Sequence, residues 1–304
     1  MDAARFSLVR LAGGHCAVHA QEYGEAMHPG LGPAAEAEAL YVSQLRRCGG
    51  LRHRSGEFVL WDVGLGAAAN VLTALHATQG FAGRFRVVSF DNTLEALAFA
   101  LEHAQALGYF HGYEPVVGRL LRERVAEFPE GGRSVQWQVI VDDLPGWAAS
   151  PAAAHVPKPD AIFFDAFSPA KNPAMWTLPL FERLYALLDP RRPCVLATYS
   201  RSTMVRVALL LAGFFVGRGR GSGPKEETTV AANRLECLEE PLGAEWLRRA
   251  RRSGGAEPLR EANYRQAPLS DQSWARLQAH PQFVIGRTAT GDPSPQPAFP
   301  NLRQ

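Results

Sequence analysis

One short apolar segment, bounded by two aspartates, constrains the fold of this chain more than any other feature. The four residues between Asp160 and Asp165 are all apolar, which is typical of a strand buried on both faces of a sheet. Pro169 and Pro173 follow closely, and proline interrupts both strand ladders and helices. We therefore expect Asp165 at the carboxyl end of a central strand, on a stiff loop at the edge where open α/β sheets bind ligands. The alternative is that Asp165 only caps the following turn.

Strands and helices alternate along the middle of the chain. Apolar runs predict strands over residues 58–63, 85–90, 135–141, 160–165 and 194–199. The segments around them predict helices over residues 64–79, 93–107, 115–127, 173–188 and 203–211. Segments 214–218 and 227–232 predict an antiparallel pair that closes the sheet. The expected fold is therefore α/β and Rossmann-like, with a mainly parallel sheet, helices on both faces and an antiparallel last strand.

The same patterns divide the chain into three parts. Residues 1–55 predict a small N-terminal β/α extension, with a hairpin that turns at Gly13-Gly14 and a helix over 34–47. Residues 56–237 form the Rossmann-like domain. Residues 238–304 form a C-terminal extension, with a short arginine-rich helix near residues 248–252 and a Pro-rich end from Gly291 that is predicted to be disordered.

Composition indicates a soluble globular protein, with 46% apolar and 20% charged residues. The net charge of +2 favours no class of partner. Because Cys16, Cys48, Cys194 and Cys237 are scattered, we expect neither a cysteine metal site nor a disulfide framework. The chain has no leader-like start and no apolar run of 18 residues. We therefore expect a cytoplasmic protein without a membrane segment or a bound metal.

A glycine-rich turn follows the first of these strands. The run Gly64-Leu-Gly66-Ala-Ala-Ala lies between a predicted strand and a predicted helix, where glycines let the backbone approach a bound ligand closely. Asp62 precedes the turn by two residues. A carboxylate is unfavourable beside a pyrophosphate at a helix N-terminus but suits a cofactor that carries sulfonium and ammonium groups. The pattern favours S-adenosylmethionine, with a nicotinamide or other nucleotide cofactor as the alternative.

Carboxylates also end the second and third strands. Asp91 can accept hydrogen bonds from both ribose hydroxyls of a cofactor, although nicotinamide enzymes use the same position. Asp142 or Asp143 can accept a hydrogen bond from an adenine amino group. Because the carboxyl ends of parallel strands meet at one edge of a sheet, we expect these side chains, Asp62 and Asp165 to form one site.

Residues 165–176, Asp-Ala-Phe-Ser-Pro-Ala-Lys-Asn-Pro-Ala-Met-Trp, carry a family resemblance. They closely resemble the Asp-Gly-Phe-x-Pro-x-Lys-Asn-Pro-x-Met-Trp signature of the MnmC-like methyltransferases. This family comprises the methyltransferase half of the bifunctional tRNA wobble-uridine enzyme MnmC and its stand-alone relatives. The likeness runs from about residue 58 to residue 232, and Ala166 stands where the family usually has glycine.

The resemblance implies a class I methyltransferase fold and S-adenosylmethionine as the methyl donor. It implies that the acceptor is the exocyclic amine of 5-aminomethyl(-2-thio)uridine at the tRNA wobble position. Asp165 would orient this amine and accept its proton, or would mainly shape the cofactor pocket. The candidate substrate contacts are His28, Pro169, Lys171, Asn172, Trp176 and Lys225.

Further along, the chain departs from the family pattern. The family's Gly-x-x-x-Lys-Arg-Glu-Met run corresponds to residues 221–228, where Lys225 and Glu227 match but Glu226 replaces an arginine. This reversal of charge should weaken binding to a phosphate backbone. No second dinucleotide fingerprint follows, so we expect no flavin domain. The alternatives are a small-molecule amine methyltransferase, another nucleotide-cofactor enzyme on the same fold, and a non-catalytic tRNA-binding protein with a vestigial pocket.

Overall fold

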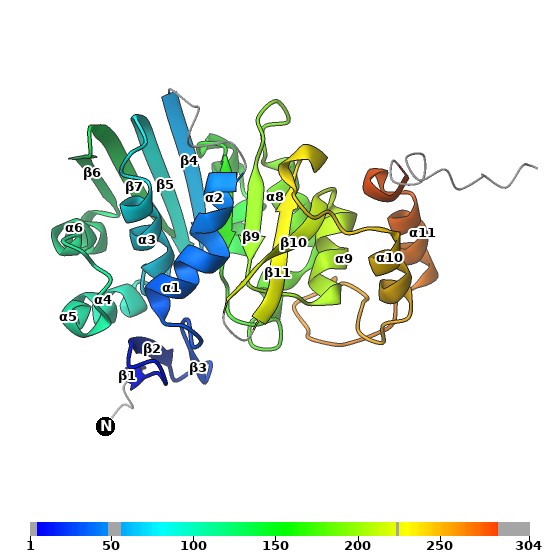
Figure 1. The fold of residues 1–304 in the computed structure, drawn as a ribbon, viewed down its shortest axis with the longest axis horizontal. Helices are drawn as coiled ribbons and strands as arrows, with labels where there is room; N and C mark the ends of the chain where they lie inside the picture. Colours follow the sequence, from blue (N-terminus) through cyan, green and yellow to red (C-terminus); the bar gives the residue numbers. More distant parts are fainter. Residues whose placement is uncertain (1–4, 48–55, 223–224, 285–304) are drawn as a thin grey trace, which may run out of the picture.

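The computed structural model describes residues 5–47, 56–222 and 225–284. Its centre is an eight-stranded sheet in the order β10-β11-β9-β8-β4-β5-β7-β6 (Figure 1). The five strands from β9 to β7 are parallel, whereas β6, β10 and β11 pair antiparallel with their neighbours. The strands are β4 (Gly56–Val63), β5 (Gly83–Asp91), β6 (Val125–Glu130), β7 (Arg133–Val141), β8 (Ala161–Phe164), β9 (Val195–Thr198), β10 (Phe215–Ser222) and β11 (Lys225–Ala232).

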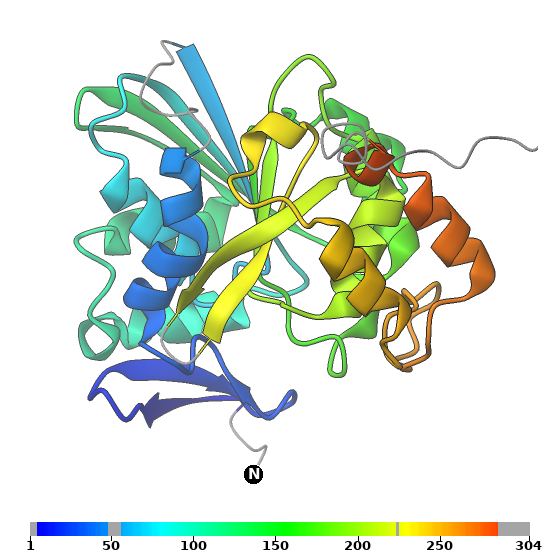
Figure 2. The ribbon, with the colours of Figure 1, turned by 45° about the vertical axis from the view of Figure 1, so that its right-hand side comes forward.

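Helices cover both faces of this sheet (Figures 1 and 2). One face packs against α1 (Pro33–Ala37), the π-helical turn η1 (Glu38–Val42), α2 (Ser43–Arg47), α3 (Ala69–Ala77), α4 (Glu95–Glu102), α5 (Ala104–Leu107) and α6 (Glu114–Glu123). The other face packs against α7 (Leu144–Ala148), α8 (Leu178–Ala186) and α9 (Thr203–Ala212). Short 3-10 turns are η2 (Pro151–His155), η3 (Pro173–Trp176) and η4 (Leu235–Cys237).

The residues of β4 explain why this strand lies in the middle of the sheet. Its last six residues are all buried. Val59, Trp61 and Val63 join the core on one side of the sheet, whereas Phe58 and Leu60 join the core on the other. Apolar side chains on both faces are what a parallel strand between two helical layers requires. The predicted α/β fold is confirmed.

A crevice forms where the strand order reverses beside β4. This strand pairs with β5 on one side and with β8 on the other, so the loops that follow β4, β5 and β8 diverge at the carboxyl edge. A separate antiparallel sheet of β1 (Phe6–Arg10), β2 (Cys16–Ala20) and β3 (Glu25–Ala26) lies below this edge in Figure 1. The predicted hairpin is confirmed, and β3 adds a strand that the sequence did not indicate.

Two predicted helices have different bounds in the structure. The helix expected over 115–127 ends at Glu123, Arg124 adopts a left-handed conformation (φ 64°), and β6 follows as an antiparallel edge strand. Pairing of residues 125–130 with β7 overrides the weak local preference for a helix there. Pro129 is compatible with an edge strand. The helix expected from Gly64 begins only at Ala69, after a turn.

Beyond β11, two helices extend the sheet's second helical layer. α10 (Ala244–Arg251) confirms the predicted arginine-rich helix, while α11 (Asp271–Gln278) was not predicted. Trp246, Leu247 and Leu277 join the core that covers α9.

Residues 285–304, which include the Pro-rich end, lie outside the described residues, and the three-part division of the chain stays a prediction. In the part of the chain described, no helix is long and apolar enough to cross a membrane.

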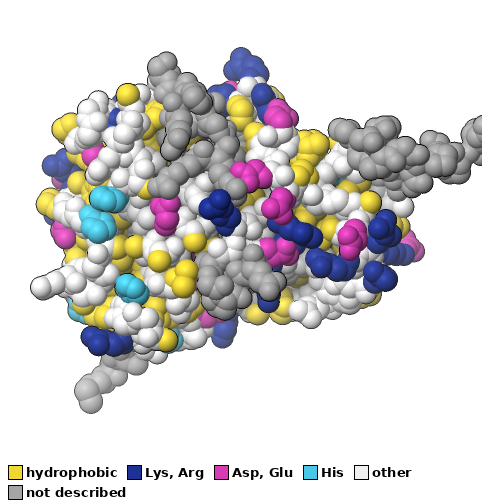
Figure 3. Space-filling model, in the orientation of Figure 1, with side chains coloured by type: hydrophobic (Ala, Val, Ile, Leu, Met, Phe, Trp, Pro, Cys, Tyr) yellow, Lys and Arg dark blue, Asp and Glu magenta, His cyan; other side chains and the backbone are white. Residues whose placement is uncertain are grey.

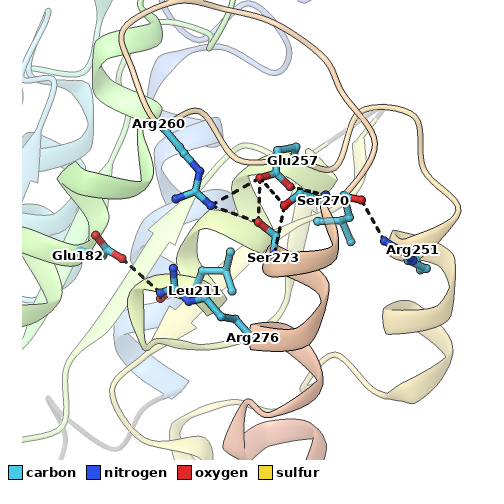
Figure 4. Close-up of polar contacts among 9 residues, drawn as sticks. Glu182, Leu211, Arg251, Glu257, Arg260, Ser270, Ser273 and Arg276 are labelled. Atoms are coloured by element: carbon cyan, nitrogen blue, oxygen red, sulfur yellow. Dashed lines mark hydrogen bonds and ion pairs between the residues drawn. The ribbon is translucent and has the colours of Figure 1, made fainter.

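A polar network fixes the segment between α10 and α11 (Figure 4). The Glu257 carboxylate accepts hydrogen bonds from the Ser270 backbone nitrogen (2.9 Å) and from the Ser273 hydroxyl (2.8 Å). Arg260 pairs with the same carboxylate at 3.6 Å. Because the Ser270 hydroxyl caps α11 by accepting from the Ser273 backbone nitrogen (3.2 Å), Glu257 also positions the start of that helix.

Candidate active site

A cavity of about 720 Å³ lies between the strand ends of the main sheet and the N-terminal sheet. Its walls come from the loops after β4, β5, β7 and β8 and from the segment before α1. Its size is within the range of cofactor and small-molecule sites. Among the described residues that line it, eight carry carboxylates and one carries a guanidinium: Glu22, Glu25, Glu36, Asp91, Glu95, Asp142, Asp143, Asp165 and Arg5. The described ranges contain no group of three or more His, Cys, Asp or Glu placed to hold a metal ion.

The glycine turn after β4 brings two strand ends into contact. Gly64 and Gly66 have φ values of 86° and 50°, and the Gly64 nitrogen donates to the Phe90 carbonyl at 3.0 Å. A Cβ atom on Gly64 would lie only 2.6 Å from the backbone oxygen of Asp165. Glycine is therefore required both for the backbone conformation and for the close approach of the loop after β8.

Asp91, at the end of β5, binds this glycine turn. Its Oδ2 accepts from the Gly66 nitrogen at 2.9 Å, and its Oδ1 accepts a longer bond from the Thr93 nitrogen at 3.4 Å. Burial raises the pKa of Asp91, and the neighbouring backbone N–H groups oppose that rise. A carboxylate offers about four acceptor sites, so Asp91 retains capacity for the hydroxyl donors of a ligand in the cavity.

Asp62 lies deeper, within β4, and is 1% exposed. Its Oδ2 accepts from the Ser89 hydroxyl at 2.8 Å, whereas its Oδ1 is buried without a hydrogen-bond partner among the described residues. Burial raises the pKa of Asp62 to about 7; the Ser89 hydrogen bond lowers it, and the charges of Asp165 and Asp91 raise it. A cation nearby would stabilise the ionised form of this carboxylate.

Asp165 is held from two sides at the cavity wall. The Tyr41 hydroxyl donates to Oδ1 at 2.6 Å, and the Asn70 amide donates to Oδ2 at 2.7 Å. Burial and then the Asp165 charge raise the pKa of Tyr41 well above its usual value, so this phenol remains a donor. His28 Nε2 lies 3.6 Å from Oδ2. The side chain of Asp165 is 17% exposed and lines the cavity, as the strand-end position predicts.

Three residues around Asp165 were not identified from the sequence. Tyr41 projects from η1, Asn70 lies in the first turn of α3, and Glu36 lies in α1. Asn70 offered a weak signal, as a polar residue in the first turn of a mainly apolar helix. Tyr41 and Glu36 resemble ordinary helix residues in the sequence, so only their contacts identify them.

The predicted substrate residues that follow β8 lie in different environments. Asn172 lines the cavity, whereas Pro169 and Lys171 belong to the same loop but lie outside the cavity lining. Trp176 is fully buried, and its indole nitrogen donates to the Phe167 carbonyl at 2.7 Å. This position corrects the prediction that Trp176 contacts a substrate: the large apolar ring packs in the core and supports the loop from behind.

The remaining predicted residues have different environments. His28, Asp142 and Asp143 line the cavity. Both aspartates are exposed; the Asp143 carboxylate caps α7 by accepting from the Gly146 nitrogen at 3.1 Å. Each can still accept a bond from an adenine amino group, so the choice between them stays open. Lys225 is the first residue of β11, and its side chain lies outside the described part of the chain.

Comparisons with known proteins agree with this geometry. Residues 124–234 match a family model described as S-adenosyl-L-methionine-dependent methyltransferase. The chain is 32% identical over 219 residues to the tRNA 5-methylaminomethyl-2-thiouridine biosynthesis bifunctional protein MnmC of Ectopseudomonas mendocina, covering 70% of this chain and 32% of that protein. It is 30% identical over 247 residues to the protein of the same name from Aeromonas hydrophila, covering 75% and 35%.

The crystal structure of MnmC2 from Aquifex aeolicus has the same fold. Its TM-score is 0.65 at 27% sequence identity, covering 91% of this chain and 85% of that chain. This protein is an MnmC-like, S-adenosyl-L-methionine-dependent methyltransferase. The resemblance found in the sequence is confirmed, as is the class I methyltransferase fold. The MnmC-like chain spans about a third of the length of the curated relatives it matches.

The residues of the MnmC-like chain fit the methyl donor that the family uses. Gly64 and Gly66 give a close backbone approach beside the cavity. Asp62 has an unpaired buried oxygen, and Asp91 has spare acceptor capacity. Both carboxylates suit the positive groups and ribose hydroxyls of S-adenosyl-L-methionine better than they suit a phosphate.

The Gly64→Ala variant should be less stable than its matched control, Gly14→Ala. Both positions have a left-handed backbone (φ 86° and 82°), but nothing lies within 4 Å of a Cβ on Gly14. The conformational cost of about 1–2 kcal/mol applies to both variants, and overpacking against Asp165 adds about 1–3 kcal/mol only at Gly64. Urea denaturation measures the two free energies of unfolding. Equal losses of unfolding free energy in the two variants would show that a Cβ atom on residue 64 does not clash with Asp165.

The Asp91→Ala variant should bind S-adenosyl-L-methionine more weakly by about 1.5–3 kcal/mol, the scale of a charge-assisted hydrogen bond. Glu95→Ala is the control, because it removes a carboxylate from the same cavity that instead pairs with Arg5 at 2.6 Å. Isothermal calorimetry on both folded variants measures the affinities. Equal losses would show that only the negative field of the cavity matters, and an unchanged Asp91→Ala affinity would remove Asp91 from the site.

Proposed function

We propose that this protein transfers a methyl group from S-adenosyl-L-methionine to the exocyclic amine of 5-aminomethyl(-2-thio)uridine at the wobble position of tRNA. The observation that carries the proposal is the Asp165 carboxylate, fixed by Tyr41 and Asn70 in a cavity lined by carboxylates. Such a lining favours cations, including a protonated amine. The names of the curated relatives refer to biosynthesis of the corresponding methylaminomethyl nucleoside. A tRNA partner and a cytoplasmic location belong to this proposal.

The residues around Asp165 prepare the amine for reaction. A primary alkyl amine is mostly protonated at neutral pH, and a protonated nitrogen has no lone pair for attack. Asp165 accepts a proton from the ammonium group, while Tyr41 and Asn70 keep its carboxylate oriented. Bound S-adenosyl-L-methionine supplies an electrophilic methyl group on its sulfonium. The protein's remaining task is to position the amine in line with that group.

The N-terminal sheet closes the cavity over the loop after β8. The Tyr23 ring stacks on Phe167 with ring centroids 3.9 Å apart and planes 14° apart. The Ser168 hydroxyl donates to Glu25 Oε1 at 2.7 Å. Because all four residues line the cavity, these contacts limit the access of water to the reacting groups.

The charge distribution also favours a second candidate, a small-molecule amine as acceptor. Glu22, Asp142 and Asp143 are exposed carboxylates of the cavity and would repel a phosphate backbone. The segment 201–265 contains 12 Lys/Arg against 8 Asp/Glu. Figure 3 shows basic and acidic side chains interleaved on the side of α10 and α11. An interleaved surface of this kind is typical of ordinary solvated helices, so it does not favour tRNA by itself.

The acceptor is tested with purified protein, S-adenosyl-L-methionine and tRNA that carries 5-aminomethyl-2-thiouridine. The reaction is run on the intact tRNA and, separately, on the free nucleosides from a digest of the same tRNA. Nucleoside mass spectrometry then detects the methylated product of each reaction. Methylation of the intact tRNA is the expected result. Reaction with the free nucleoside alone would favour the small-molecule candidate. Cofactor binding without any turnover would indicate a vestigial site.

The Asp165→Asn variant should separate proton acceptance from a role in cofactor binding. Asparagine keeps the shape but removes the charge, so cofactor affinity should change little while methyl transfer falls about 10²-fold or more at neutral pH. The rate should recover partly at higher pH, where the amine arrives deprotonated. Glu22→Gln is the control for loss of one cavity charge, because Glu22 is an exposed carboxylate of the same cavity. A single-turnover pH series decides: parallel loss of binding and turnover without recovery would assign Asp165 to the cofactor pocket.

A further inference from the structure

His28 lies between two carboxylates in the cavity wall. Its Nε2 is 3.6 Å from Asp165 Oδ2, and its Nδ1 is 3.8 Å from Glu36 Oε2. The His28 side chain is 10% exposed and that of Glu36 is 7% exposed. An imidazole can accept a proton on one nitrogen while it donates a proton from the other. The ring can therefore pass a proton from one carboxyl group to the other.

The residue that carries this ring has an unfavourable backbone conformation. His28 has a φ of 57°, in the left-handed region that a non-glycine residue rarely adopts. Such strain costs on the order of 1–3 kcal/mol and is concentrated at functional sites. The Glu36 carboxylate fixes the following loop, because it accepts hydrogen bonds from the backbone nitrogens of Gly30 and Leu31. Glu36 thus both faces the ring and holds the segment that carries it.

The other groups that face Asp165 are unsuited to carrying a proton away. Asn70 does not titrate. Burial and the Asp165 charge raise the pKa of Tyr41 well above its usual value. Burial, followed by the charges of Asp165 and Glu25, also raises the pKa of Tyr199, which lines the same cavity. Among the described residues around Asp165, this leaves His28 as the route from its carboxylate.

Resting on the function proposed above, we propose that His28 relays the amine proton from Asp165 to Glu36. In each turnover an N–H bond of the substrate ammonium breaks and its proton moves to Asp165 Oδ2. The freed nitrogen lone pair forms the bond to the methyl carbon, and the departing sulfur keeps its bonding pair. The proton then passes to His28 Nε2, the Nδ1 proton moves to Glu36 Oε2, and Glu36 releases it to water. Exchange of the ring proton from Nε2 to Nδ1 through water restores the starting tautomer before the next turnover. One proton leaves per methyl group transferred, so the charges balance.

The contact of the His28 ring with the two carboxylates is first tested without substrate, by NMR of the full chain labelled with nitrogen-15 in histidine. The ring nitrogen signals of His28 should shift in Asp165→Asn and in Glu36→Gln, because each variant removes a carboxylate that faces the ring. Exposed His155 is the internal control and should not move. Unchanged His28 ring signals in either variant overturn the relay.

The relay itself is tested by single-turnover methylation of the tRNA probe by His28→Gln and His28→Gly. Glutamine can hydrogen-bond but cannot pass a proton between two atoms, so the rate at pH 7 should fall about 10-fold to 100-fold. It should recover towards wild type at pH 10, where a larger share of the amine arrives deprotonated. Glycine suits the left-handed backbone and leaves space for a free base, so added imidazole should restore the His28→Gly rate.

The possible outcomes separate the relay from the proposed function. A rate loss that is equal at all pH values and is not rescued by imidazole shows a merely structural role and overturns the relay, as does an unchanged His28→Gln rate. If wild-type protein methylates no tRNA, the proposed acceptor fails. The NMR measurement still shows whether the His28 ring responds to Asp165 and Glu36. Calorimetry with S-adenosyl-L-methionine verifies that each variant is folded.

Discussion

The contact between Gly64 and the backbone of Asp165 is the constraint on which the site depends. With a Cβ atom at residue 64 only 2.6 Å from that oxygen, any other residue would push the ends of β4 and β8 apart. Because they lie together, a carboxylate that follows β8 stands beside the glycine turn of β4. The same turn is bound from the other side by Asp91, through the Gly66 nitrogen. The missing side chain of Gly64 therefore lets the loops after β4 and β8 lie together at the cavity wall.

Concentrating carboxylates in one cavity has an electrostatic cost. Burial raises the pKa values of Asp62 and Asp91, and in Asp62 the neighbouring carboxylates raise it further. The site is consequently destabilised in its ionised state until a cation lies within it. A sulfonium, an amino-acid ammonium and a substrate ammonium would each relieve this repulsion. Under the proposed function, this repulsion would contribute both to cofactor affinity and to a preference for a cationic acceptor.

The segment of residues 5–47 supplies several side chains to the site although it lies outside the main sheet. Its residues stack on and hydrogen-bond to the loop after β8 through Tyr23 and Glu25. The same segment contributes His28, and its helical part contributes Glu36 and Tyr41 to the surroundings of Asp165. Closure of the cavity therefore depends on this segment, whereas orientation of the Asp165 carboxylate is shared between Tyr41 of the segment and Asn70 of α3.

The sequence by itself determined the α/β fold, the strand ends with their carboxylates and the glycine turn, because these depend on local periodicity and on residue types at short spacing. It also supplied the family resemblance, through twelve consecutive residues. Only the tertiary structure decided which groups surround Asp165: Tyr41 and Asn70 lie 124 and 95 residues away along the chain. It likewise placed Trp176 in the core and turned residues 125–130 into an edge strand. Those outcomes follow from packing between distant segments, which no local pattern encodes.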